Sequence, residues 1–149
     1  MATNFLWGGV GSVVHLLTTE LNGLANGTLS ALGPEVGAVN NYQMGQLYIH
    51  LASAAFVDPS YINIYLVPSS TTAAGATYDS FHSAAASNLQ NYLAATVYIN
   101  GATAAQDITF PYVTIPLGFF KALALTGGSC PTLAGTLNTV DLYPTPTQY

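Results

Sequence analysis

Histidine, cysteine and carboxylate side chains supply much of protein chemistry, and this chain has few of them. Its 149 residues include three histidines, one cysteine and six acidic residues. Metal ligands usually occur at short spacings that place them on one side of a strand or helix. His15, His50 and His82 have no second histidine, cysteine or carboxylate two or four residues away. We therefore expect no metal site and interpret each histidine as a structural or surface residue.

Sequence signatures of catalysis are also missing. The Gly-x-Ser-x-Gly motif that surrounds the nucleophilic serine of many hydrolases does not occur. Asp58 lies in a proline turn, Glu35 follows Gly-Pro, and Asp141 alternates with apolar neighbours, so we interpret these carboxylates as solvated surface residues. Cys130 has no charged neighbour or nearby histidine that would activate its thiol. The sequence predicts a protein without catalytic residues and without a cofactor.

The chain carries almost no positive charge. Lys121 is its one basic residue, the net charge is −5, and only 5% of residues are charged, against about 25% in a typical domain. Nucleic-acid binding and polybasic membrane contacts both need clustered lysine and arginine. No apolar run is long enough for a transmembrane helix, and no basic N-terminal segment suggests a secretion signal. We expect no nucleic acid or membrane as partner, and synthesis in the cytoplasm.

A surface with so few charges must consist of small polar residues, alanine and tyrosine. This is typical of a subunit that buries much of its surface in an assembly. The chain has ten tyrosines, a residue favoured at interfaces because it combines apolar area with a hydroxyl group. Tyr48 and Tyr143 lie opposite the apolar faces of their segments, and we predict that they contact a partner. The alternative is that tyrosines simply cover both faces of a sheet.

Alternation of apolar and polar residues predicts two strands in the middle of the chain. Residues 46–51 place Leu47, Ile49 and Leu51 on one face, and residues 61–67 repeat this pattern. Asp58-Pro59-Ser60 between them is a turn signal, so we expect a hairpin-like pair.

Four later segments are rich in β-branched or aromatic residues and are bounded by Gly, Pro or Asn: 92–99, 112–117, 119–125 and 136–143. Asn100-Gly101 favours a tight turn, and residues 69–76 and 101–106 are expected to be loops. No alternation of strands with helices indicates a parallel sheet. The prediction is an all-β protein, an antiparallel β-sandwich, with one domain over residues 12–149.

Two segments fit more than one structure. Residues 12–24 carry a leucine pattern that fits a helix beginning at Ser12, but they also alternate as a strand does, and we expect the strand. Residues 80–95 are rich in alanine and are compatible with a short helix.

Several motifs resemble those of a known family. They are Leu17-Thr-Thr-Glu-Leu-Asn-Gly-Leu-Ala-Asn-Gly27, Tyr65-Leu-Val-Pro-Ser69, Ile115-Pro-Leu-Gly-Phe-Phe-Lys121, Gly127-Gly128, and the closing segment 137–143 followed by Pro144. From about Leu16 to Tyr149 the chain resembles the small all-β decoration, or cement, proteins on the heads of tailed bacteriophages. It departs from the family in having Leu117 where a second proline is usual and in keeping only Lys121 as a basic residue.

The resemblance implies a jelly-roll-like sandwich and a non-enzymatic virion protein. Such a protein would bind the outer surface of the capsid, across neighbouring major capsid subunits, and would stabilise it as a homo-oligomer, a dimer or trimer. Residues 1–11 resemble a short N-terminal arm in which Phe5, Leu6 and Trp7 anchor to a partner and Gly8-Gly9 forms a hinge. The alternative for the arm is that Trp7 folds back over its own domain. The alternative function is a receptor- or carbohydrate-binding β-module of a phage tail or fibre.

Overall fold

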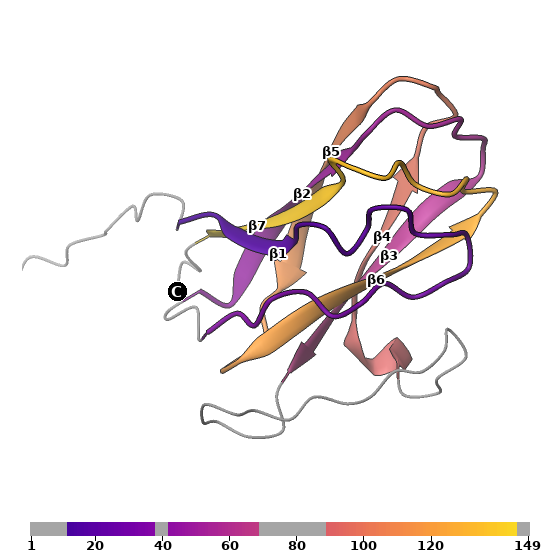
Figure 1. Ribbon diagram of the computed structural model, residues 1–149. Coiled ribbons are helices and arrows are strands. Elements are labelled where there is room, and N and C mark those ends of the chain that lie inside the picture. The colour runs from indigo at the N-terminus through magenta and orange to yellow at the C-terminus, as the bar shows by residue number, and fades with distance from the viewer. Residues whose placement is uncertain (1–11, 38–41, 69–88, 146–149) are drawn as a thin grey trace, which may run out of the picture.

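Two antiparallel sheets packed face to face form the protein. The computed structural model describes residues 12–37, 42–68 and 89–145 (Figure 1). Sheet A has the strand order β1-β7-β2-β5, and sheet B has the order β4-β3-β6. The elements are β1 (Val14–Leu17), β2 (Met44–Leu51), β3 (Ser60–Pro68), the 3-10 helix η1 (Leu89–Tyr92), β4 (Leu93–Ile99), β5 (Gln106–Thr114), β6 (Phe120–Gly128) and β7 (Thr139–Thr145). The predicted all-β sandwich is confirmed.

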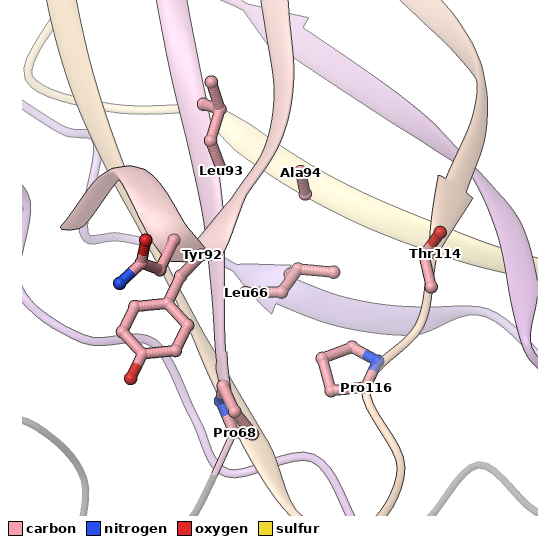
Figure 2. Close-up of a pocket in the computed structure, with 8 residues that line it drawn as sticks. Leu66, Pro68, Tyr92, Leu93, Ala94, Thr114 and Pro116 are labelled. Atoms are coloured by element: carbon pink, nitrogen blue, oxygen red, sulfur yellow. The ribbon is translucent and has the colours of Figure 1, made fainter. Parts of the chain in front are cut away.

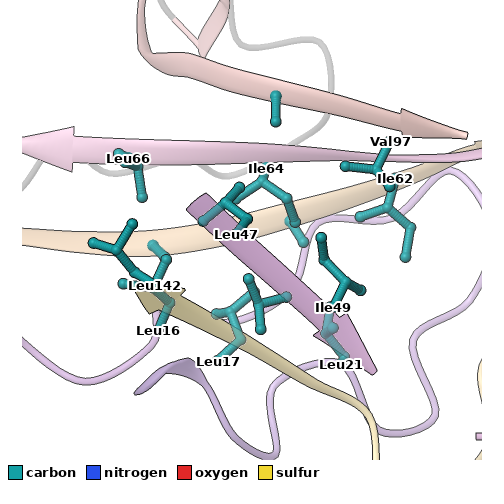
Figure 3. Close-up of a cluster of buried hydrophobic side chains, with 14 of the residues drawn as sticks. Leu16, Leu17, Leu21, Leu47, Ile49, Ile62, Ile64, Leu66, Val97 and Leu142 are labelled. Atoms are coloured by element: carbon teal, nitrogen blue, oxygen red, sulfur yellow. The ribbon is translucent and has the colours of Figure 1, made fainter. Parts of the chain in front are cut away.

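Alternate residues of the strands fill the space between the sheets. In β2 every second residue is buried, which places Leu47, Ile49 and Leu51 in the core as predicted. Ile62 and Ile64 of β3 project toward them from the opposite sheet (Figure 3). Burying one such side chain contributes about 1.5–3 kcal/mol, so this layer holds the two sheets together.

The strand order is that of a jelly roll. Residues 27–36 run antiparallel beside β6 through the bridges Leu29–Leu125 and Val36–Phe120. When this segment is counted as the second strand of eight, the sheets have the orders 1-8-3-6 and 2-7-4-5. These are the orders produced by the two Greek keys of a jelly roll.

The segment 27–36 covers the edge of β6 without forming a regular ladder. Its backbone N–H groups donate to β6 carbonyls in the pairs Gly27–Thr126, Ser30–Ala124, Gly33–Ala122 and Val36–Phe120, at 2.8–3.0 Å. The donors are three residues apart and the acceptors two apart, so the segment is less extended than its partner. It still satisfies alternate carbonyls of β6, which protects this edge from pairing with another chain.

The expected hairpin between residues 46–51 and 61–67 is wrong. β2 pairs with β5 and β7 in sheet A, whereas β3 pairs with β4 and β6 in sheet B. The turn at Asp58-Pro59 carries the chain from one sheet to the other, as most connections of a jelly roll do. The tight turn expected at Asn100-Gly101 is wrong for the same reason, because β4 and β5 lie in different sheets.

The strand predicted at residues 112–117 is present, but it begins before residue 112 and ends before residue 117. β5 covers Gln106–Thr114, so Gln106 belongs to a strand and not to the preceding loop, and residues 115–117 lie beyond its end. Pro111 and Tyr112 interrupt the alternating pattern of this strand, so the sequence does not indicate its full length. They lie at a register irregularity opposite β2, where Tyr112 has φ 60°. An edge strand tolerates this because only one side of it pairs.

The two ambiguous segments are shorter elements than expected. Within residues 12–24 the strand is confirmed for Val14–Leu17 only. It ends where the Glu20 carboxylate accepts the N–H groups of Thr18 and Thr19, at 2.7 and 3.0 Å. In 80–95 the described part holds one short helix, the four-residue 3-10 helix η1 before β4, and residues 80–88 lie outside the described residues.

A second apolar cluster covers part of the outer face of sheet B. Tyr65 and Val67 of β3 and Leu123 of β6 are buried on this face. The cluster is completed by Leu89 and Tyr92 of η1 and by Leu29 and Leu32 of the edge segment. The remainder of this face has no such cover among the described residues.

Asn138 joins three loops in the interior. It is fully buried, its Oδ1 accepts the Ala52 N–H at 3.0 Å, and its Nδ2 donates to the Ala134 carbonyl at 2.7 Å. Its backbone N–H and Nδ2 both donate to Asn22 Oδ1, each at 3.1 Å. A single amide thus fixes the loop before β7 to the loops that follow β1 and β2.

Replacing this amide should destabilise the fold. We expect Asn138→Ala to lower the free energy of unfolding by about 2–4 kcal/mol, because it leaves buried donors and acceptors without partners. The matched control is Asn100→Ala, since Asn100 is exposed and its backbone, not its side chain, bonds to Gln106. Urea unfolding followed by far-ultraviolet circular dichroism measures both. Equal stability of the two variants would contradict this role of Asn138.

Candidate functional site

The outer face of sheet A gathers most of the polar chemistry of the described residues. The strand register places His15 of β1 opposite Asp141 of β7, and Asp141 opposite Tyr48 of β2. It also places His50 of β2 opposite Asp107 of β5. Together with Tyr143 of β7, these six residues form what we call the His–Asp–Tyr face. It spans all four strands of the sheet.

One histidine–carboxylate pair links β1 to β7. His15 Nδ1 lies 2.7 Å from Asp141 Oδ1. The His15 side chain is 67% exposed, but that of Asp141 is only 16% exposed. The expectation that Asp141 is a solvated surface residue is therefore wrong. It does point away from the core, but its neighbours on β1 and β2 cover it.

A second pair links β2 to β5 and includes a tyrosine. His50 Nδ1 lies 2.6 Å from Asp107 Oδ1, and the Tyr48 hydroxyl donates a hydrogen bond to the same carboxylate. The bonds from His50 and then from Tyr48 lower the pKa of Asp107, because both stabilise the ionised carboxylate. The bond to Asp107 raises the pKa of Tyr48, since a phenolate would repel this carboxylate.

The structure brings together the two tyrosines that the sequence singled out. Tyr48 and Tyr143 are diagonal neighbours on β2 and β7, with ring centroids 6.4 Å apart and planes at 83°. This edge-to-face arrangement is a favourable one for aromatic rings. Both rings are half-buried. Their contact with a partner stays a prediction, and Phe5, Leu6 and Trp7 lie outside the described residues.

Sequence reasoning missed the two histidine–aspartate pairs. Each pair joins residues more than 50 positions apart, so no local spacing signals it. Asp107 was also not recognised as a strand residue, because the sequence predicts that this strand begins only at residue 112. One signal was present, however: Tyr48 and His50 share the polar side of an alternating strand, which places their side chains on one face.

The His–Asp–Tyr face offers hydrogen bonds and aromatic edges to a partner. A catalytic triad needs a nucleophile bonded to the histidine. Here the Tyr48 hydroxyl bonds to the carboxylate instead. In the part of the chain that the structure describes, no group of three or more His, Cys, Asp or Glu residues is placed to hold a metal ion. Cys130 is buried, and burial raises the pKa of its thiol, which makes the thiolate scarce at neutral pH.

A hollow of about 360 Å³ opens where the two sheets meet near the ends of β3 and β5. Leu66, Ala94 and Pro116 supply apolar walls, and Thr114 and Tyr92 also line the hollow (Figure 2). None of its lining residues is charged. Its lining offers no carboxylate, histidine, lysine or cysteine that could act as acid, base or nucleophile.

Comparison with known proteins does not identify a relative. No family model matches the chain, and neither a curated protein nor a solved structure matches it. Among the described residues, no helix is long and apolar enough to cross a membrane. The function is therefore inferred from the surface of the sandwich and from its sequence motifs.

The geometry around Asp107 predicts how its pKa responds to substitution. We expect His50→Gln and Tyr48→Phe each to raise the pKa of Asp107, and His50→Gln to raise it more, because the His50 bond is the larger cause. The control is His15→Gln, which removes the partner of Asp141 and leaves the contacts of Asp107 intact. Carboxyl carbon shifts followed by NMR against pH give the three values. An Asp107 titration that moves equally in all three variants would contradict the assignment.

The same shift predicts a pH dependence of stability. The pKa of Asp107 is lower in the folded protein than the value of about 3.9 expected for an unfolded chain. Its ionised form therefore stabilises the fold above that pH, and this contribution disappears as the pH falls through the folded pKa. Asp107→Asn should lower Tm slightly at pH 6, by about 4 °C at most, and should leave Tm unchanged at pH 2. A Tm loss that persists at pH 2 would point to a different cause.

Proposed function

We propose that this protein is a non-enzymatic subunit that decorates and stabilises the head of a tailed bacteriophage. The observation that carries the proposal is the depletion of charge. One basic and six acidic side chains share 8120 Å² of accessible surface. A sparsely charged surface of tyrosine, threonine and alanine suits burial against other subunits better than exposure on a dispersed monomer. The motifs that resemble decoration proteins support the same function.

The fold is compatible with this function but does not decide it. Jelly rolls occur in viral capsid proteins and also in lectins. A fold alone does not identify an activity. What supports a structural role is that the sandwich encloses its own core and covers the β6 edge with the segment 27–36.

The His–Asp–Tyr face is our candidate for the surface that meets the capsid. Its two carboxylates each lie within hydrogen-bond distance of a histidine, so contact with another protein would not leave either carboxylate without a polar partner. Tyr48 and Tyr143 add apolar area in the middle of this face. The partners would be the major capsid protein and sister copies in a dimer or trimer, on the outer surface of the head.

Decoration would stabilise the head by mass action. A subunit that contacts two capsid proteins binds only where both are in place, so its binding free energy favours the assembled shell. Many weak contacts repeated over the shell would add through multivalency. Two parts of this proposal can be tested: the force that holds the subunit on the shell, and the effect of the subunit on the stability of the head.

Apolar burial should hold the subunit to the shell. Burial contributes about 25 cal/mol per Å², whereas an exposed ion pair contributes about 0–1 kcal/mol, and Lys121 is the one lysine or arginine in the sequence. We expect attachment to purified heads to survive a rise from about 0.1 M to 1 M salt, which shortens the screening length from about 10 Å to 3 Å. Release by salt alone, measured by co-sedimentation, would contradict this.

Substitutions should locate the contact. We expect Tyr48→Ala and Tyr143→Ala, and deletion of residues 1–11, each to weaken attachment about tenfold or more. Tyr112→Ala and Lys121→Ala are the controls, since Tyr112 is 70% exposed on the same sheet but lies outside the His–Asp–Tyr face. Unchanged Tm values establish that the variants are folded. Loss of attachment in the controls alone would place the contact elsewhere.

Loss of the protein should weaken the head. Heads without it should assemble but rupture at a lower temperature than complete heads, and purified protein added back should restore the rupture temperature. Release of packaged DNA on heating, followed by a dye, measures this. If bare and decorated heads rupture at the same temperature, the stabilising role is wrong.

A further inference from the structure

Among the described residues, the outer face of sheet B is covered in one part and exposed in another. Tyr65 and Val67 lie beneath η1 and the edge segment 27–36. Earlier on β3, Tyr61 and Asn63 point to the same side and are only half-buried. Their partners on β4 are Tyr98 and Thr96. We call these four residues the Tyr61–Tyr98 platform.

Two aromatic rings make up the apolar part of the platform. The Tyr61 and Tyr98 ring centroids are 6.1 Å apart, with planes at 62°. Tyr98 is 71% exposed. Tyr61 lies across Gly127 of β6, where a Cβ atom would overlap its ring. The missing side chain at Gly127 therefore lets the Tyr61 ring lie against the sheet, which presents a rigid surface beside Tyr98.

Hydroxyl and amide groups border the rings. Thr96 Oγ1 donates to Asn63 Oδ1 at 2.8 Å, and Asn63 also bonds to the Tyr65 hydroxyl. An amide offers two donors and two acceptor lone pairs, so these bonds leave part of its capacity unused. The platform therefore combines apolar ring faces with oriented neutral hydrogen-bonding groups.

Its size and charge limit what the platform can bind. A tyrosine buries about 150–250 Å² when fully covered, so the two rings offer less than about 500 Å². A standard protein interface needs about 800 Å² from each partner. None of the four platform residues is charged, which disfavours an ionic ligand. A small neutral molecule with one apolar face and several hydroxyl groups fits best.

The geometry points to a binding site for neutral carbohydrate on the Tyr61–Tyr98 platform. The C–H face of a pyranose ring packs on Tyr98, and its hydroxyl groups bond to Asn63 and Thr96. The platform and the His–Asp–Tyr face are on the outer faces of opposite sheets. A subunit attached through sheet A would therefore present the platform outward, but sugar binding by the isolated protein does not depend on that attachment.

The test uses the purified full-length chain and a defined panel of saccharides. The panel contains oligosaccharides that end in glucose, galactose, N-acetylglucosamine or mannose, together with sialylated versions. Saturation-transfer NMR and calorimetry should detect at least one neutral member with Kd of about 1 mM or tighter. Tyr98→Ala should weaken this binding at least tenfold, and Asn63→Ala should also weaken it. Tyr112→Ala, which removes a tyrosine of nearly equal exposure from the other sheet, should leave it unchanged.

Several results would overturn the inference. They are no binding by any neutral saccharide at about 10 mM, tighter binding of sialylated than of neutral members, or equal binding by wild type and Tyr98→Ala. Light scattering on the same samples provides a further test. If Tyr98→Ala converts an oligomer to a monomer, the platform is a contact between copies and not a sugar site. Failure of head attachment with intact sugar binding would leave this inference standing and remove the proposed function.

Discussion

The register of the strands is the constraint on which the rest of the structure depends. Leu47, Ile49 and Leu142 face the opposite sheet because alternate residues of β2 and β7 are buried. A slip of one residue would move this apolar set to the surface and bring Tyr48 and His50 into the core. Burial therefore determines not only how the sheets pack but also which polar residues meet outside. His50 lies beside Asp107, and Tyr48 beside Asp141, because the core leaves those positions on the outer face.

The outer faces of the two sheets differ in the kinds of side chain that they expose. Sheet A carries two histidine–aspartate pairs and tyrosines, whereas the outer face of sheet B, in the part of the chain that the structure describes, is divided between a small apolar cluster and an exposed aromatic platform. The irregular segment 27–36 contributes to this difference. It takes the place of a jelly-roll strand beside β6, protects that edge, and supplies Leu29 and Leu32 to the cluster. With few charges available to limit association, protection of exposed edges is an important safeguard against unwanted pairing.

Sequence reasoning predicts the strands better than their partners. The alternation in residues 46–51 identifies both the strand and its buried face, because that signal is local. Pairing is not local: the turn at Asp58-Pro59 marks a change of direction but does not reveal that the chain moves to the other sheet. The strand at Gln106–Thr114 was partly missed since Pro111 is tolerated only at an edge, which is a property of the assembled sheet. Tyr48 and Tyr143 were predicted as surface tyrosines, but the histidine–aspartate pairs beside them depend on contacts between distant strands.

The central claim is that this protein covers a viral shell in many copies and holds it together through the His–Asp–Tyr face. Its abundance in purified particles tests this most directly. Gel densitometry of particles that contain the protein, calibrated against the major capsid band, gives the number of copies per head. The account predicts hundreds of copies in a fixed ratio to the capsid protein. A handful of copies per particle would contradict it and would place the protein in a tail or fibre.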